Sequence, residues 1–172
     1  YNDFSFCDFK IAINSLLKTL GIESSRTHIT NLEFGFNINI EESPRLIIEN
    51  QLLMFDYKEA NRFSKYRGKG CFKEFQMTDY SLKIYDKSMQ YKLAKNILRI
   101  EQKITSSRYL KNKKISCLDD INKHTLNILY VSLFKLIGRL TLLDSTKPPT
   151  ELRLDKIVIF SNALSPTYWK NE

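Results

Sequence analysis

The sequence predicts an α+β fold in which an antiparallel sheet has helices packed on one face and an open polar face on the other. Three segments, residues 32–40, 80–87 and 97–104, alternate apolar and polar side chains with the period of a half-buried strand. Residues 8–20 and 116–140 instead repeat apolar side chains at helical spacing. An antiparallel sheet covered by helices on one face accounts for both patterns.

Local start and stop signals define the first elements. The helix over residues 8–20 is expected to end at Gly21, because glycine tolerates the left-handed backbone at a helix C-terminus. After the first strand, Ser43 and Pro44 suit the cap and the first position of a second helix, which we expect to run to about Phe55.

A strand meander is predicted for the middle of the chain. Residues 57–70 are polar and basic, which indicates a helix end and an exposed loop. A strand over residues 71–77 follows, and a short turn joins it to strand 80–87. Strand 97–104 completes the meander.

One domain is expected over residues 1–172, because this length supports a single substantial core. Its C-terminal helical part covers residues 116–145, and a Pro-Pro pair then breaks the helical pattern. The tail, residues 146–172, holds a short apolar strand and an aromatic pair. The chain begins at Tyr1 without an initiator Met, which indicates a fragment of a longer protein.

The charge balance favours a polyanionic partner. The chain has 27 Lys and Arg against 19 Asp and Glu, a net charge of +8, and such an excess is typical of proteins that bind nucleic acid. Three widely spaced cysteines fit neither a disulfide framework nor a zinc knuckle, so we expect reduced thiols and a cytoplasmic protein. No apolar run reaches the ~18 residues of a membrane span, and no signal-peptide pattern is present.

The polar sides of the three alternating strands carry residues suited to phosphate chemistry. In register, they would gather Glu33, Lys83, Tyr85, Lys87, Arg99 and Glu101. Glu33 and Glu101 together could hold Mg²⁺ or Mn²⁺, which prefer oxygen ligands. Lysine and arginine would act as fixed cations beside a phosphoryl group, and a tyrosine is a plausible nucleophile for a phosphodiester. The same alternation also fits a merely solvated sheet face.

Several other chemistries lack support in the sequence. The chain has no Gly-rich phosphate loop, no G-x-S-x-G elbow and no H-E-x-x-H motif, so nucleotide and peptide hydrolysis are not indicated. A histidine-hydrophobic-histidine motif is also absent, and His28 is expected to point toward the core, given its parity with Leu32.

Two consecutive motifs resemble a known family. Residues 82–90 read Leu-Lys-Ile-Tyr-Asp-Lys-Ser-Met-Gln, residues 98–104 read Leu-Arg-Ile-Glu-Gln-Lys-Ile, and a leucine-containing stretch follows over residues 110–121. This order resembles the rolling-circle replication initiators of filamentous phages and of staphylococcal-type plasmids. Glu33 lies where that family tends to carry an acidic residue on an early strand. The resemblance covers roughly residues 29–121, an endonuclease-like core.

The resemblance implies a DNA nicking and joining enzyme of the HUH class. An active-site tyrosine would attack one strand at an origin, remain linked to the 5′ phosphate and require Mg²⁺ or Mn²⁺. By position, Glu33 and Glu101 would be the metal ligands, and Lys87 would lie close to the scissile phosphate.

The nucleophile departs from the family pattern. We expect it on the strand before the Tyr-acidic-Lys motif, and that register falls near Phe72, which has no hydroxyl. Either the chain is a catalytically dead relative, or the tyrosine is Tyr85, Tyr80 or Tyr66. Tyr85 ranks first because it shares the parity of Lys83 and Lys87, whose charges would favour a phenolate. The alternative role for Tyr85 is to position the substrate by a hydrogen bond without attacking it.

Two further hypotheses belong to other classes of protein. The chain could be a non-catalytic DNA-binding module for single strands or origin duplex, or an interaction domain whose charge only aids solubility. The cations expected to contact DNA are Lys65, Arg67, Lys69, Lys73, Lys83, Arg99 and Arg108.

Overall fold

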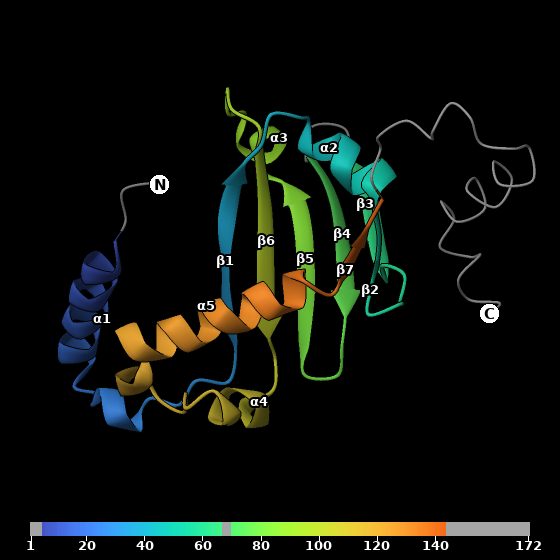
Figure 1. The fold of residues 1–172 in the computed structure, drawn as a ribbon. Helices are drawn as coiled ribbons and strands as arrows, with labels where there is room; N and C mark the ends of the chain where they lie inside the picture. The colour runs from blue at the N-terminus through green and yellow to red at the C-terminus, as the bar shows by residue number, and fades with distance from the viewer. Residues whose placement is uncertain (1–4, 67–69, 144–172) are drawn as a thin grey trace, which may run out of the picture.

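The computed structural model describes residues 5–66 and 70–143, and these form an α+β fold. Its centre is an antiparallel five-stranded sheet of order β1-β6-β5-β4-β3 (Figure 1). In that order the strands are β1 (Leu32–Asn39), β6 (Ile97–Ile104), β5 (Tyr80–Asp86), β4 (Gly70–Gln76) and β3 (Arg62–Tyr66). The predicted fold class is therefore confirmed.

A smaller sheet and the helices complete the described chain. The two-stranded sheet pairs β2 (Leu52–Phe55) with β7 (Leu140–Leu142). The helices and helical turns are α1 (Phe6–Leu20), η1 (Ser24–Arg26), α2 (Pro44–Leu46), η2 (Ile47–Gln51), α3 (Lys87–Tyr91), α4 (Ser107–Asn112), η3 (Leu118–Asp120) and α5 (Lys123–Ile137). Within the described residues, no helix is both long and apolar enough to cross a membrane.

Helix α1 confirms the first predicted helix and shows why it begins earlier than expected. Ser5 caps it: the Ser5 hydroxyl accepts from the Asp8 backbone N–H at 3.2 Å, and the Asp8 carboxylate accepts from the Ser5 backbone N–H at 2.8 Å. Gly21 ends the helix with a φ of 64°, as predicted.

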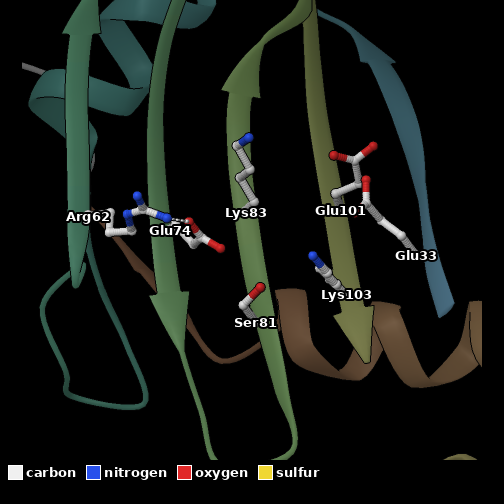
Figure 2. Close-up of a pocket in the computed structure, with 7 residues that line it drawn as sticks. All are labelled: Glu33, Arg62, Glu74, Ser81, Lys83, Glu101 and Lys103. Carbon is white, nitrogen blue, oxygen red and sulfur yellow. Dashed lines mark ion pairs between the residues drawn. The ribbon is translucent and has the colours of Figure 1, made fainter. Parts of the chain in front are cut away.

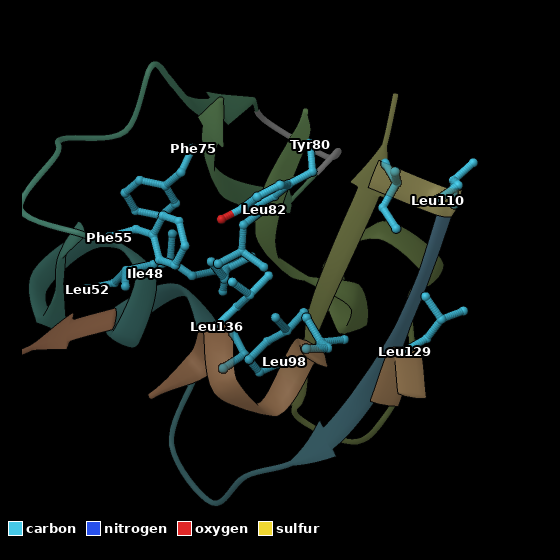
Figure 3. Close-up of a cluster of buried hydrophobic side chains, with 14 of the residues drawn as sticks. Ile48, Leu52, Phe55, Phe75, Tyr80, Leu82, Leu98, Leu110, Leu129 and Leu136 are labelled. Carbon is cyan, nitrogen blue, oxygen red and sulfur yellow. The ribbon is translucent and has the colours of Figure 1, made fainter. Parts of the chain in front are cut away.

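Helix α5 crosses one face of the large sheet and buries it (Figure 1). Leu129 and Leu136 of α5 join Leu82 and Leu98 of the sheet in one apolar cluster (Figure 3). The helical part predicted over residues 116–145 was too long at both ends, because α5 begins only at Lys123 and Leu140 belongs to β7. The polar sides of β1, β5 and β6 lie on the opposite, open face of the sheet.

The prediction for residues 43–70 was wrong. The helix that starts at Pro44 lasts only through α2 and the π-turn η2, and the chain then extends into β2, whose four residues are all buried. An apolar run this short fits a buried helix and a buried strand equally well. The expected basic loop contains β3, which pairs with β4 at the edge of the sheet.

Strand boundaries in the meander match the prediction closely. β6 spans the expected residues, whereas β5 ends one residue early, at Asp86. The Asp86 carboxylate accepts from the Met89 backbone N–H at 3.0 Å and so starts α3 at Lys87. The predicted Pro-Pro break and the apolar strand of the tail lie outside the described residues.

Candidate functional site

The open face is built from three rows of side chains that run across the strands. Strand pairing sets the rows, because directly opposite residues on neighbouring strands share a face. The first row is Ser64, Phe72, Tyr85, Arg99 and Asn37; the second is Arg62, Glu74, Lys83, Glu101 and Gly35; the third is Gln76, Ser81, Lys103 and Glu33. These three rows together define the open face.

A shallow pocket of about 230 Å³ lies over the second and third rows. Its lining residues are Glu33, Arg62, Glu74, Ser81, Lys83, Glu101 and Lys103 (Figure 2). Glu33 and Glu101 come from neighbouring strands, and in Figure 2 the Glu33 side chain extends toward Glu101. The prediction that both acids share one face is confirmed.

Glu101 is the most enclosed acid of this pocket. Only 9% of the residue is exposed, and its Oε1 accepts a charge-assisted hydrogen bond from Arg99 Nε at 2.6 Å. The same oxygen accepts a longer hydrogen bond from the Tyr85 hydroxyl at 3.4 Å. A buried carboxylate needs such partners, since removing it from water without them is costly.

Gly35 makes room for Glu101. The two residues are directly opposite on β1 and β6. A Cβ atom at Gly35 would run into the Ile100 backbone oxygen and would lie 2.9 Å from Glu101 Cα and 3.0 Å from Glu101 Cγ. The missing side chain therefore lets the strands approach and keeps space above them for the Glu101 carboxylate.

Lys87 reaches the open face from outside the sheet. It is the first residue of α3, yet its Nζ donates to Asn37 Oδ1 at 3.3 Å. The same oxygen accepts from Arg99 Nη1 at 3.1 Å, so Asn37 holds two cations at the end of the first row. Burial lowers the pKa of Lys87, and the nearby Arg99 charge lowers it further.

The environment of Tyr85 favours the neutral phenol. Burial raises its pKa to about 12, and the negative charge of Glu101 adds to the rise, while Arg99 opposes it. The expectation that neighbouring cations would favour a phenolate was therefore wrong for this arrangement. The reason is that burial of the phenol, which strand parity does not show, raises its pKa most, and the nearby Glu101 carboxylate acts in the same direction.

The other candidate tyrosines occupy different positions. Tyr80 is on the packed face, 9% exposed, with its ring 5.4 Å from that of Tyr109. It is thus separated by the sheet from Glu33 and Glu101. Tyr66 lies in β3 opposite Gly70, and only its backbone is described.

The cations expected to contact DNA are divided among several places. Lys83 and Arg99 are on the open face. Lys73 is not, because its Nζ donates to the Leu52 backbone oxygen on the packed side. Arg108 is in α4 and pairs with Asp79 at 3.4 Å. The side chain of Lys65 in β3 is not described, and Arg67 and Lys69 lie outside the described residues.

Arg62 and Glu74 are open-face residues that the sequence pattern did not reveal. They pair across β3 and β4 with 3.7 Å between Nη1 and Oε2. The basic composition of the segment favoured a loop, although the polar-apolar-polar order at residues 62–64 is a weak strand signal. His28 also differs from expectation, since it is exposed and forms an isolated bridge with Cys117.

The acids of the open face suit a hard divalent cation in their chemistry. Across residues 5–66 and 70–143, no group of three His, Cys, Asp or Glu gathers in a way that could hold a metal ion. Mg²⁺ commonly uses one or two carboxylates and completes its shell with water and substrate phosphate. Glu33 and Glu101 fit that pattern as a pair of oxygen donors.

Comparisons of the chain with protein-family models, with curated proteins and with solved structures found no match.

Proposed function

We propose that this protein nicks and rejoins DNA as a rolling-circle replication initiator, with the open face as its active site. The observation that carries the proposal is the convergence of four residues from distant parts of the chain. The family resemblance singles out Glu33, Lys87 and Glu101, and Tyr85 joins them because it shares the strand parity of Lys83 and Lys87. Glu33 and Glu101 line one pocket, and the Tyr85 hydroxyl donates to Glu101. Lys87 shares the Asn37 oxygen with Arg99, which in turn donates to Glu101.

Glu33 and Glu101 would hold Mg²⁺ or Mn²⁺ together with a DNA phosphate. A bound cation would polarise the phosphoryl oxygens and neutralise charge that develops during strand transfer. As a ligand, Glu101 would use its carboxylate to contact both the cation and Arg99. Arg99 would in addition contact the DNA phosphate. Lys83 and Lys103 line the same pocket and supply further positive charge.

Tyr85 would act as the nucleophile. Its phenolic oxygen attacks the phosphorus atom, the bond from phosphorus to the 3′ oxygen breaks, and a 5′-phosphotyrosine link forms. The phenolic proton passes to Glu101, whose Oε1 already accepts the Tyr85 hydrogen bond. Lys87 gives a proton to the departing 3′ oxygen, and its lowered pKa makes it a stronger acid than an ordinary lysine.

A non-catalytic DNA-binding role is the second candidate. Two observations favour it: the pKa of Tyr85 is raised to about 12, and Glu101 is ion-paired with Arg99 at 2.6 Å. With a neutral Tyr85 phenol and a Glu101 carboxylate already paired with Arg99, this surface is stable without a bound metal. In this case the open-face cations would contact phosphates without strand cleavage.

Covalent adduct formation separates the two functions. The full chain is incubated with Mn²⁺ and either supercoiled plasmid or a pool of random-sequence single strands, and products are resolved on denaturing gels. Mass spectrometry then maps any tyrosine that carries a nucleotide. We expect an adduct on Tyr85 that Tyr85→Phe abolishes and that Tyr57→Phe, at a residue 85% exposed and outside the open face, leaves intact.

Each other outcome has a definite meaning. An adduct on Tyr66 would support the nicking function and identify Tyr66, instead of Tyr85, as the nucleophile. DNA binding that weakens with salt but yields no adduct would establish the second candidate. Cleavage that arises only in Phe72→Tyr would identify an inactivated initiator.

A further inference from the structure

An apolar ring interrupts the polar character of the open face. Phe72 lies on the same side of β4 as Glu74 and Gln76, because side chains two residues apart in a strand share a face. Helix α5 covers the opposite side of the sheet (Figure 1). Directly across from Phe72 on β5 is Tyr85, so two aromatic residues are cross-strand neighbours at one end of the face. Both residues are half-buried.

A cation accompanies the two rings. Lys83 Nζ lies 4.9 Å from the centre of the Phe72 ring and 5.3 Å from the centre of the Tyr85 ring. Arg99 and Lys87 border the same row on the other side of Tyr85. Aromatic rings that alternate with cations are the arrangement by which sheet surfaces bind unpaired nucleotides, because the rings stack on bases while the cations contact phosphates.

We propose that Phe72 is a stacking site for one unpaired base of single-stranded DNA. This proposal rests on the proposed function and names its substrate class. The base displaces Lys83 from the Phe72 ring, and the flexible lysine side chain moves to the adjoining phosphate. The next phosphate along the strand then lies beside Tyr85, Arg99 and Lys87.

The geometry selects single strands over duplex DNA. In a duplex the faces of each base are covered by its neighbours, so a base must leave the stack before it can lie against a protein ring. The open face offers a shallow surface across the strands, to which an extended single strand can conform. Phe72 therefore has a role that needs no hydroxyl, at the position where the family pattern led us to expect the nucleophile.

A pair of matched oligonucleotides tests this site. Binding of the full chain to oligothymidylate is compared with binding to an abasic strand of equal length, which carries the same phosphates without bases. We expect the wild type to bind oligothymidylate more tightly by roughly 5- to 150-fold per stacked base. Phe72→Leu should remove most of that difference while leaving abasic affinity and its salt dependence unchanged.

Two variants control for fold and ring chemistry. Phe72→Tyr keeps a ring and should retain the preference for bases. Phe63→Leu removes a phenylalanine of β3 that is 45% exposed and paired with Lys73 on the packed side, and it should also retain the preference. Circular dichroism verifies that Phe72→Leu is folded. The comparison of the two strands in the wild type needs no variant at all.

The outcomes distinguish this site from the function on which it rests. Equal affinity of the wild type for the two strands would overturn base stacking and leave phosphate binding intact. A preference for bases that survives in Phe72→Leu would place the bases elsewhere and equally overturn the assignment. Failure to bind either strand at low salt would overturn DNA binding itself.

Discussion

At the scale of single residues, Glu101 connects the parts of the open face. Its carboxylate joins Arg99 and Tyr85, and it lines the pocket that also contains Glu33. Since it is almost fully buried, any change in its partners alters the charge felt by the Tyr85 hydroxyl. Metal binding and the protonation of Tyr85 are therefore expected to be coupled through this one side chain.

We predict that Mn²⁺ stabilises the folded protein through Glu33 and Glu101. An ion that binds only the folded state at 100 times its dissociation constant adds about 2.7 kcal/mol to the free energy of unfolding. Thermal unfolding with and without Mn²⁺ measures the effect, which Glu33→Gln and Glu101→Gln should each abolish. Glu74→Gln, on the same face but paired with Arg62, should preserve it. If Mn²⁺ does not stabilise the wild type, the proposed metal site is wrong.

The raised pKa of Tyr85 predicts a specific loss of stability at alkaline pH. Below about pH 10 the phenol is protonated in both the folded and unfolded states. Between pH 10 and about pH 12 the unfolded state releases this proton while the folded state retains it, so the free energy of unfolding falls as pH rises. Tyr85→Phe should show a smaller fall over this range than the wild type in urea titrations. Parallel pH profiles for the two proteins would contradict the assigned shift.

At the scale of elements, the pairing of β1 with β6 is what brings the two acids together. The two strands are antiparallel over their whole lengths, and Gly35 lies at the point of closest approach to Glu101. The backbone of β1 is thus part of the site even though Gly35 has no side chain. Disturbing the pair should affect both the stability of the sheet and the position of Glu101.

Gly35→Ala should destabilise the protein by at least about 1–3 kcal/mol, because the added methyl group overlaps the backbone of β6. Chemical denaturation measures the loss. Gly138→Ala is the matched control: its nearest neighbours would be 3.6 Å away, so the methyl group fits there. That variant should change stability by less than about 1 kcal/mol in either direction. Equal effects from both substitutions would show that β1 can move to accommodate a side chain.

At the scale of the whole molecule, the net charge of +8 agrees with a phosphate-rich partner. The open face mixes both signs, since Glu33, Glu74 and Glu101 lie among Arg62, Lys83, Arg99 and Lys103. Such mixing weakens the long-range electrostatic attraction of DNA to this face. Binding would then depend on contacts between individual cations and phosphates. The dependence of binding on salt counts those contacts.

Binding to single-stranded DNA should weaken with salt, with a logarithmic slope of about −0.7 for each phosphate contact. Lys103→Gln and Lys83→Gln should each reduce the slope by about that amount, because each removes one contact. Lys18→Gln, at an exposed lysine of α1, should leave it unchanged. Fluorescence anisotropy over a series of salt concentrations measures the slope. Binding that is insensitive to salt would exclude phosphate contacts as its main source.

The sequence by itself determined which side chains share a face of the sheet. Glu33, Lys83, Arg99 and Glu101 could be grouped in advance, because side-chain direction in a strand follows from local backbone geometry and repeats every second residue. The C-terminal cap of α1 at Gly21 is local in the same sense. In these cases the local structure depends on a few neighbouring residues, so it can be predicted from the sequence pattern.

Only the tertiary structure decided which strands are neighbours. β1 pairs with β6, more than fifty residues away, and this pairing places Gly35 opposite Glu101 and lets Arg99 and Lys87 share the Asn37 oxygen. It also decided that residues 52–55 extend into a buried strand instead of continuing a helix. The physical reason is that strand order and burial depend on contacts between distant segments, whereas parity and capping depend on adjacent residues.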